Sequence, residues 1–90
     1  MGNFTLSRLA FASIQEQCVY IGARNPSAAT AVRAELHRAC DLISDYPEMG
    51  RKIEGTGLRY HITRKYRYRV AYRITSEGIE IANILHPKQR

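Results

Sequence analysis

Residues 65–74, KYRYRVAYRI, alternate between apolar and basic side chains with a period of two. This is the period of a β-strand, whose successive side chains point to opposite faces of a sheet. One set, which comprises the tyrosines with Val70 and Ile74, is expected to face a core. The other set contains three arginines, Arg67, Arg69 and Arg73. A row of like charges adds no stability, so it is either a solvated sheet face or a binding surface.

Residues 8–21 carry apolar side chains three or four positions apart, which is the spacing of an amphipathic helix. Ser7 directly precedes this pattern and is a typical N-cap residue, because its hydroxyl can accept a hydrogen bond from a free amide of the first turn. Gly22 is expected to close the helix, and Phe11 to widen its buried side. The expected buried stripe comprises Ala10, Ile14, Cys18 and Ile21.

A second helical pattern begins after Asn25 and runs to about Ser44. Asn25 is a typical N-cap, and Pro26 follows at the first helical position, where the missing N–H of proline costs nothing. The connection between the two helices is short, so they are expected to pack antiparallel. The expected buried stripe comprises Ala29, Val32, Leu36, Ala39, Cys40 and Ile43.

Residues 45–57 hold one proline and three glycines and are interpreted as a loop. A loop of this length in so short a chain often carries function. Residues 58–62 then alternate, and a turn leads into the strand at 65–74. The TSEG turn at 75–78 leads into a last strand at 79–86. The second half of the chain is therefore expected to form a three-stranded antiparallel meander.

Both helices are expected to cover one face of this meander, because each element needs a partner for its apolar side. With residues 3–7 as a short edge strand, the predicted fold class is α+β. The chain is expected to be a single domain over residues 1–90, with an antiparallel helical hairpin packed on a small antiparallel sheet. The side chains expected to face the helices are Leu58, Tyr60, Ile62, Tyr68, Val70 and Tyr72. Those expected on the open face are Arg59, His61, Arg67, Arg69 and Arg73.

The N-terminus contains no long apolar run, since Arg8, Ser13 and Gln15 interrupt it. Neither a signal peptide nor a membrane span is expected, so the protein is expected in the cytoplasm. In that reducing compartment Cys18 and Cys40 are expected to be small buried apolar residues, with a redox pair as the alternative.

The histidines do not form a metal-binding motif. His37, His61 and His86 are scattered along the chain, whereas zinc sites use ligands at short, characteristic spacings. Neither a metal site nor a cofactor is expected.

The positive charge belongs to the second half of the chain. Residues 1–50 carry four Lys/Arg and five Asp/Glu, a net charge of −1, whereas residues 51–90 carry ten and three, a net charge of +7. These two values agree with the total of +6. A one-sided field of this kind favours an acidic partner, which is either a nucleic acid or an acidic protein segment.

The chain contains four segments in a fixed order: YIGARNPSAA (20–29), YPEMGRKIEGTGLRY (46–60), YRYRVAYRI (66–74) and IEIANILHPKQR (79–90). Together they resemble the RelE/ParE superfamily of bacterial toxins over nearly the whole chain. The resemblance implies a helical hairpin on a small antiparallel sheet. It also implies the toxin of a type II toxin–antitoxin module, a plasmid stabilisation system. Such a toxin forms a hetero-oligomer with an antitoxin whose C-terminal segment wraps it, and an acidic or amphipathic segment would suit the positive half.

The superfamily has two functional branches. RelE-like members cut mRNA in the ribosomal A site with basic residues and a C-terminal aromatic residue or histidine, whereas ParE-like members poison DNA gyrase and lack that catalytic set. The RelE-type set is incomplete here, because the basic residue expected after the last strand falls on Gln89. The residues that a RelE-like toxin would use are Arg59, Arg69 and His86, with phosphate contacts from Lys52 and Arg67.

The NPSAA turn, the PEMGR segment and the LHPKQR ending resemble the ParE-like branch more closely. The resemblance therefore implies a gyrase inhibitor without catalysis of its own. The alternative is a ribosome-dependent mRNA endonuclease. Under the first hypothesis no residue is catalytic, and the basic residues form a surface that binds the target or the antitoxin. The residues expected on it are Arg51, Lys52, Arg59, His61, Arg67, Arg69, Arg73, His86, Lys88 and Arg90.

A third hypothesis is a simple nucleic-acid-binding module on the basic sheet face. A stacking platform for bases needs aromatic rings on the same face as the positive charges. The alternation within residues 65–74 places the tyrosines opposite the arginines, which argues against such a platform. The tyrosines are instead expected to be large core residues with their hydroxyls at the rim.

Overall fold

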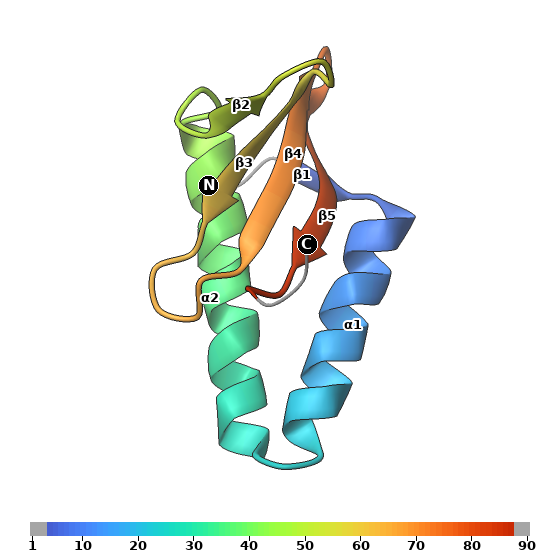
Figure 1. The fold of residues 1–90 in the computed structure, drawn as a ribbon, viewed down its shortest axis with the longest axis vertical. Helices are drawn as coiled ribbons and strands as arrows, with labels where there is room; N and C mark the ends of the chain where they lie inside the picture. Colours follow the sequence, from blue (N-terminus) through green and yellow to red (C-terminus); the bar gives the residue numbers. More distant parts are fainter. Residues whose placement is uncertain (1–3, 88–90) are drawn as a thin grey trace.

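A computed structural model describes residues 4–87 of the chain. Within them, two N-terminal helices pack against a five-stranded mixed sheet, which confirms the predicted α+β class. Figure 1 shows the helices as an antiparallel hairpin whose closed end extends beyond the sheet. The elements are, in chain order, β1 (Phe4–Leu6), α1 (Arg8–Gly22), α2 (Pro26–Asp45), β2 (Arg51–Ile53), β3 (Leu58–Ile62), β4 (Arg69–Thr75) and β5 (Gly78–Leu85).

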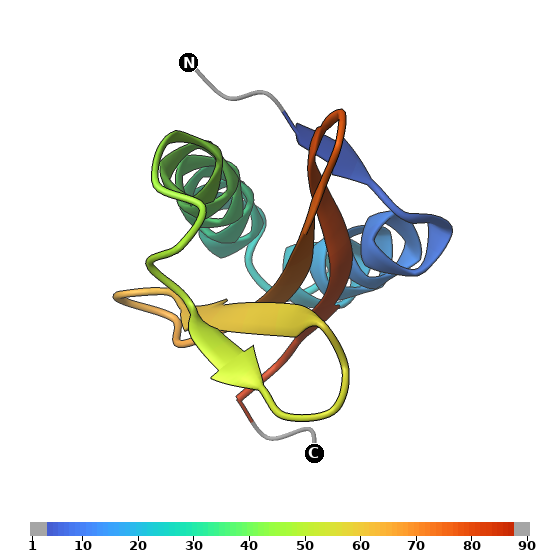
Figure 2. The same cartoon turned by 90° about the horizontal axis from the view of Figure 1, so that it is seen from above.

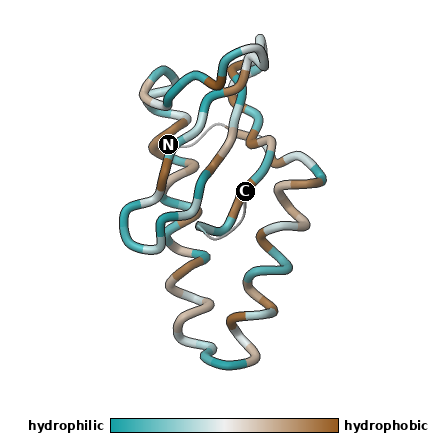
Figure 3. Tube along the Cα trace, in the orientation of Figure 1, coloured by the Kyte–Doolittle hydropathy of each residue, from teal (hydrophilic) through white to brown (hydrophobic). Residues whose placement is uncertain are grey.

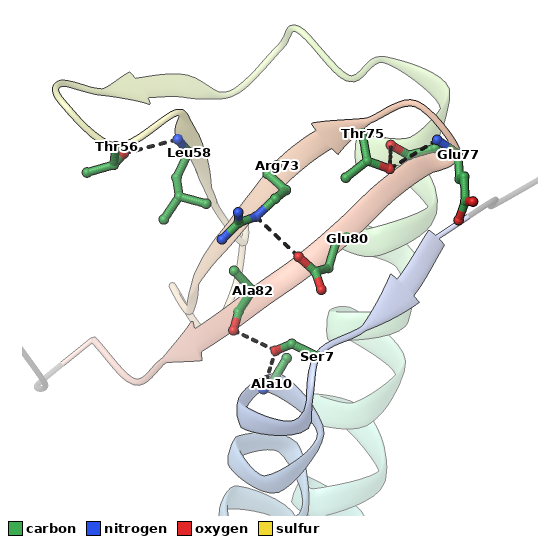
Figure 4. Close-up of polar contacts among 10 residues, drawn as sticks. Ser7, Ala10, Thr56, Leu58, Arg73, Thr75, Glu77, Glu80 and Ala82 are labelled. Carbon is green, nitrogen blue, oxygen red and sulfur yellow. Dashed lines mark hydrogen bonds and ion pairs between the residues drawn. The ribbon is translucent and has the colours of Figure 1, made fainter.

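Ser7 joins the start of α1 to the sheet. Its hydroxyl oxygen accepts a hydrogen bond of 3.0 Å from the amide of Ala10, which confirms the predicted N-cap. The same hydroxyl donates to the carbonyl oxygen of Ala82 in β5 at 2.7 Å (Figure 4). One side chain therefore caps α1 and also bonds to the backbone of β5. These two hydrogen bonds fix the direction in which α1 leaves the sheet.

The second helix also begins as predicted. The Asn25 side chain accepts a hydrogen bond of 3.1 Å from the amide of Ala28, and Pro26 occupies the first turn. Cys18 and Cys40 are free and buried, as predicted. The prediction for Phe11 is wrong, because this side chain is 56% exposed. Neither of the two described helices is long and apolar enough to cross a membrane.

The strands are ordered β1-β5-β4-β3-β2. The predicted short N-terminal strand is an edge strand, and it runs parallel to β5, while the other pairs are antiparallel. The predicted turn after β4 is also present, where the Thr75 hydroxyl accepts from the amide of Glu77 at 3.2 Å and donates to the carbonyl oxygen of Gly78 at 3.1 Å (Figure 4). Figure 2 shows that the sheet is strongly twisted, with α2 on its concave side.

Two predicted boundaries in the sheet are wrong. Residues 45–57 are not all loop, because β2 lies within them and pairs with β3. A strand of three residues is too short to show a period of two, so its pairing depends on the neighbouring strand. The strand predicted at 65–74 begins only at Arg69. Before it, Thr63 and Tyr68 close a loop, in which the Thr63 amide donates to the Tyr68 carbonyl oxygen at 2.8 Å.

One hydrophobic core lies between the helices and the sheet. Hydrophobic residues recur along both helices and along the strands (Figure 3). Tyr68, Val70 and Tyr72 are buried, as their alternation predicted. The core cluster comprises Ala10, Val32, Leu36, Ala39, Cys40, Ile43, Tyr68, Val70, Tyr72, Ile79, Ile81 and Ile84.

The predicted faces of β3 are wrong. Arg59 lies directly opposite Tyr72, and His61 lies opposite Val70. Directly opposite residues of an antiparallel pair point to the same face, so Arg59 and His61 lie on the helix side of the sheet. The remaining β3 residues point to the opposite face, which we call the open face. Tyr60 lies opposite Ala71 there, and Ile62 lies opposite Arg69. We define the open face by Leu58, Tyr60, Ile62, Arg69, Ala71 and Arg73.

Candidate functional site

The open face brings an arginine and a tyrosine together. The guanidinium carbon of Arg69 lies 5.0 Å from the centre of the Tyr60 ring, which is a cation–π geometry. The expectation that tyrosines lie opposite the arginines is therefore wrong for Tyr60. Arg69 itself is exposed on this face, as predicted. The open face thus offers a positive charge and an aromatic ring side by side.

Arg73 is also on the open face, but its charge is balanced locally. Its Nε lies 3.2 Å from the Oε1 of Glu80 on the neighbouring strand β5 (Figure 4). Both side chains are partly exposed, so this ion pair contributes little stability. Its main effect is to reduce the positive charge that Arg73 presents to a partner.

A hollow lies at the start of β4 and the end of β5, next to the open face. We call it the Arg67 hollow; it has a volume of about 200 Å³. Arg67 precedes β4 and has a φ angle of 62°, in the left-handed region. The imidazole of His86 packs edge-on against the Tyr68 ring, with the ring centres 5.5 Å apart. The residues that line the hollow are Ile62, Arg67, Arg69, Leu85, His86 and Pro87.

Arg59 lies on the helix side of the sheet and stabilises the backbone there. Its Nη1 donates hydrogen bonds to the carbonyl oxygens of Glu48, at 3.1 Å, and Gly50, at 2.9 Å. Both acceptors belong to the connection between α2 and β2. The guanidinium therefore has two backbone oxygens of this connection as hydrogen-bond partners, which explains how an arginine lies on the helix side.

His61 lines a groove of about 840 Å³ between α2 and β3, which we call the α2–β3 groove. Burial lowers the pKa of His61 from its usual value, because a partly buried imidazole is less easily charged. Aliphatic side chains and charged side chains of both signs line this groove. Its lining residues are Glu35, Arg38, Ala39, Asp41, Leu42, Asp45, His61, Ile62, Thr63, Arg64 and Lys65.

Comparison with known proteins places this fold in a family. The family model for the ParE toxin of the type II toxin–antitoxin system parDE matches residues 4–90. The chain belongs to the ParE toxin family. This confirms the resemblance to the RelE/ParE superfamily and makes the chain a toxin of a type II toxin–antitoxin system.

Solved structures show the same fold for this ParE-family chain. A chain from the chromosomal ParDE toxin–antitoxin system of P. aeruginosa superposes with a TM-score of 0.83 and 17% sequence identity, and the match covers 96% of both chains. At this identity the likeness shows the fold alone. Among curated proteins, no sequence matches significantly.

The RelE-type set is not assembled in this ParE-family chain. Arg69 and His86 both line the Arg67 hollow. Arg59 lies on the opposite face of the sheet and is engaged by backbone oxygens. Because the side chains of a catalytic set must converge on one reacting centre, these three residues do not form one.

The remaining predicted binding residues are distributed over both faces. Arg51 lies opposite Tyr60, so it belongs to the open-face side of β2, whereas Lys52 lies opposite Arg59 and belongs to the helix side. Both are exposed on an edge strand. Lys88 and Arg90 lie outside the described residues.

Sequence reasoning missed Glu35, an acidic residue of this ParE-family chain that is buried on α2. Its carboxylate accepts hydrogen bonds from the amides of Lys65, at 3.1 Å, and Tyr66, at 2.7 Å. Burial alone would raise the pKa of Glu35, but these bonds and one from the Thr63 hydroxyl lower it overall. Its position between Val32 and Leu36 on the apolar stripe of α2 was the signal that could have identified it.

Proposed function

We propose that this chain acts in the cytoplasm by binding DNA gyrase and poisoning it, without catalysing a reaction itself. The observation that carries the proposal is the separation of Arg59 from Arg69 and His86 by the sheet. General acid–base catalysis needs groups within hydrogen-bonding reach of one reacting centre. Membership of the ParE toxin family supports the same target.

The charge distribution also supports a macromolecular target. The exposed side chains of Arg67 and Arg69 lie on or beside the open face, within the half of the chain that carries the excess positive charge. Such a surface accelerates association with a negatively charged complex. The gyrase–DNA complex is a target of this kind.

The α2–β3 groove is the surface that we assign to the antitoxin in this proposal. We propose that an amphipathic C-terminal segment of a ParD-type antitoxin lies in it and forms the hetero-oligomer. The partly exposed side chains of Leu42 and Ile62 offer apolar contacts. Arg64 and Lys65 at one side would pair with carboxylates of the segment. Burial of the exposed leucine supplies affinity, while the charges select the partner.

A supercoiling assay with purified gyrase tests the proposed target. The wild-type chain is expected to inhibit supercoiling and to accumulate cleaved DNA, and an excess of the cognate antitoxin is expected to restore activity. Absence of inhibition at every toxin concentration would refute the proposal. The variant Leu42→Asp is expected to lose antitoxin binding while it still inhibits gyrase.

Val19→Asp is the matched control for the groove. Val19 is 73% exposed on α1, away from the groove, so this variant changes the same surface properties elsewhere. Its antitoxin affinity is expected to be unchanged. Equal loss of antitoxin affinity in both variants would show that the groove has no special role.

One observation favours the alternative function, a ribosome-dependent mRNA endonuclease. Arg67, Arg69 and His86 surround a single hollow, so three of the groups that such an enzyme would use do meet. Mapping of mRNA ends in cells that express the chain separates the two functions. Cuts in phase with codons would support the endonuclease, whereas DNA breaks with intact transcripts would support gyrase poisoning.

A further inference from the structure

The Arg67 hollow has the composition of an anion-binding site. Arg67 and Arg69 bring guanidinium donors to it beside the ring of His86, and among residues 4–87 no acidic side chain lines it. Within residues 4–87, neither arginine forms an ion pair with an acidic side chain. Arginine presents a planar set of N–H donors that matches a phosphate in a bidentate way.

The backbone at Arg67 indicates that its side chain matters. A φ angle of 62° lies in the left-handed region, which glycine adopts without cost and a residue with a Cβ does not. A glycine at this position would therefore fold more easily. Sparsely populated backbone conformations of this kind concentrate at functional sites, and here the side chain that they orient faces the hollow.

Aromatic contacts hold the other two groups in place. The guanidinium of Arg69 lies over the Tyr60 ring at 5.0 Å, and the His86 ring packs edge-on against Tyr68 at 5.5 Å. Groups that are ordered before binding lose less conformational entropy when a ligand arrives. The donors of the hollow are therefore arranged in advance.

Apolar side chains complete the lining. Ile62, Leu85 and Pro87 surround the donors with carbon. Such neighbours lower the local dielectric constant and strengthen the attraction between arginine and an anion. A sugar–phosphate backbone offers a charged group next to the C–H groups of the sugar, which matches this combination.

We propose that the Arg67 hollow binds a backbone phosphate of DNA, with Arg67 and Arg69 as the contacts. The proposal rests on the proposed function, because a toxin that docks on gyrase meets the DNA that gyrase holds. Tyr60 lies beside the hollow on the open face, where its ring holds the Arg69 guanidinium.

Fluorescence anisotropy with labelled oligonucleotides tests the proposal on the full chain without gyrase. Single-stranded DNA, duplex DNA and RNA of the same sequence serve as probes. The wild-type chain is expected to bind DNA, and Arg67→Gly and Arg69→Gln are each expected to weaken binding about tenfold. Each variant is also expected to reduce the salt dependence of binding by about one counterion.

The melting temperature of Arg67→Gly is a second measurement. It separates a role of the side chain in binding from a role in folding. Because the variant relieves the left-handed backbone of a residue with a Cβ, its melting temperature is expected to be unchanged or raised. Weaker DNA binding together with an intact fold would support the site. Unchanged DNA binding by both arginine variants would overturn the proposal.

Arg33→Ala is the matched control, because it removes one exposed positive charge from α2, away from the hollow. It is expected to weaken DNA binding by less than about twofold. An equal loss in Arg33→Ala would mean that net charge alone drives binding, which overturns the proposal. A marked preference for RNA over both DNA probes would also overturn it.

The supercoiling assay on the same variants separates the two proposals. Gyrase inhibition without oligonucleotide binding would refute the DNA site and leave the gyrase target intact. Oligonucleotide binding that depends on Arg67 and Arg69, without gyrase inhibition, would support the DNA site and refute the gyrase target. If the variants bind DNA normally but no longer inhibit gyrase, the hollow contacts protein, and the DNA assignment is wrong.

Discussion

The hydroxyl of Tyr72 accepts a hydrogen bond of 2.9 Å from the amide of Gly50, and it donates one of 2.7 Å to the carbonyl oxygen of Pro47. Tyr72 is fully buried. Burial raises its pKa, so the hydroxyl stays protonated and can donate. The connection between α2 and β2 is therefore hydrogen-bonded to the buried Tyr72. Arg59 adds two hydrogen bonds, to the carbonyl oxygens of Glu48 and Gly50.

Tyr72→Phe is expected to lower the free energy of unfolding by about 1–3 kcal/mol, because it leaves the buried Gly50 amide without its partner. Urea denaturation followed by circular dichroism measures the change. Tyr20→Phe is the control, since Tyr20 is 58% exposed and should tolerate the loss of its hydroxyl. Equal stability of Tyr72→Phe and the wild type would contradict the role of this hydroxyl.

Gly50→Ala tests the same contact by adding a single methyl group. A Cβ at residue 50 would meet the Tyr72 hydroxyl and would lie 2.8 Å from the carbonyl oxygen of Tyr60. Since a backbone oxygen in a sheet cannot move aside freely, the cost is expected to be about 1–3 kcal/mol. Gly22→Ala is the control, because its Cβ would lie 3.6 Å from that of Ala29, an ordinary contact. Similar melting temperatures for both variants would contradict this account.

The carboxylate of Glu35 is expected to make the free energy of unfolding decrease at acidic pH. Its pKa in the folded chain is lower than the usual 4.5, so the folded state binds this proton less tightly than the unfolded state. Glu35 therefore contributes fully to the free energy of unfolding above the pKa that it has in the unfolded chain. This contribution is lost as the pH falls through its pKa in the folded chain.

Glu35→Gln is expected to cost about 1–3 kcal/mol at neutral pH, because charge-assisted bonds to the Lys65 and Tyr66 amides are lost. Urea denaturation of both chains from neutral to acidic pH provides the measurement. The difference between them should shrink as the carboxylate becomes protonated. A difference that is constant over this pH range would show that the charge of Glu35 does not matter.

Arg59 and Arg69 are expected to differ in their effects on stability. Arg59→Ala removes a donor from two backbone carbonyl oxygens and should lower the free energy of unfolding by about 1–2 kcal/mol. Arg69→Ala removes an exposed side chain and should change it by less than about 0.5 kcal/mol. Parallel denaturation curves of the two variants provide the test. The reverse order of stabilities would contradict the face assignment of β3.

The thiol of Cys40 is expected to be unreactive in the folded chain. Burial raises its pKa to about 12, and the thiolate is the reactive form. Labelling with N-ethylmaleimide at about pH 8, followed by peptide mass spectrometry, should modify Cys40 slowly in the native chain and rapidly in guanidinium chloride. Rapid labelling of the native chain would contradict the buried state.

The helices and most of the residues that they contribute to the core could be predicted from the sequence. Ser7, Asn25 and Pro26 carry their start signals within a few residues, and the apolar stripes repeat over several turns. Local hydrogen bonds and side-chain periodicity govern these features, so a single segment contains the information. Glu35 was overlooked because a buried acid breaks the apolar pattern, and its partners lie some thirty residues away in the β3–β4 loop.

The candidate site was predicted only in part. Arg69 is exposed on the open face, and the sequence identified it from its alternation with buried Tyr68 and Val70. The Arg67 hollow was not predicted as a unit, because it combines the end of β3, the residues before β4 and the end of β5. Only the packing of these strands brings Arg67 and His86 to one place.

Local patterns in the sequence were sufficient to predict the α+β class, the order and caps of the helices, and the two alternating sets of β3 and β4. Alternation states which residues of a strand share a face, but it does not state which set faces the helices. In β4 the apolar set decided this, whereas β3 carries apolar residues in one set and Arg59 and His61 in the other. The register with β4 shows that Arg59 and His61 lie on the helix side. The carbonyl oxygens of Glu48 and Gly50, which accept hydrogen bonds from Arg59, make this position favourable.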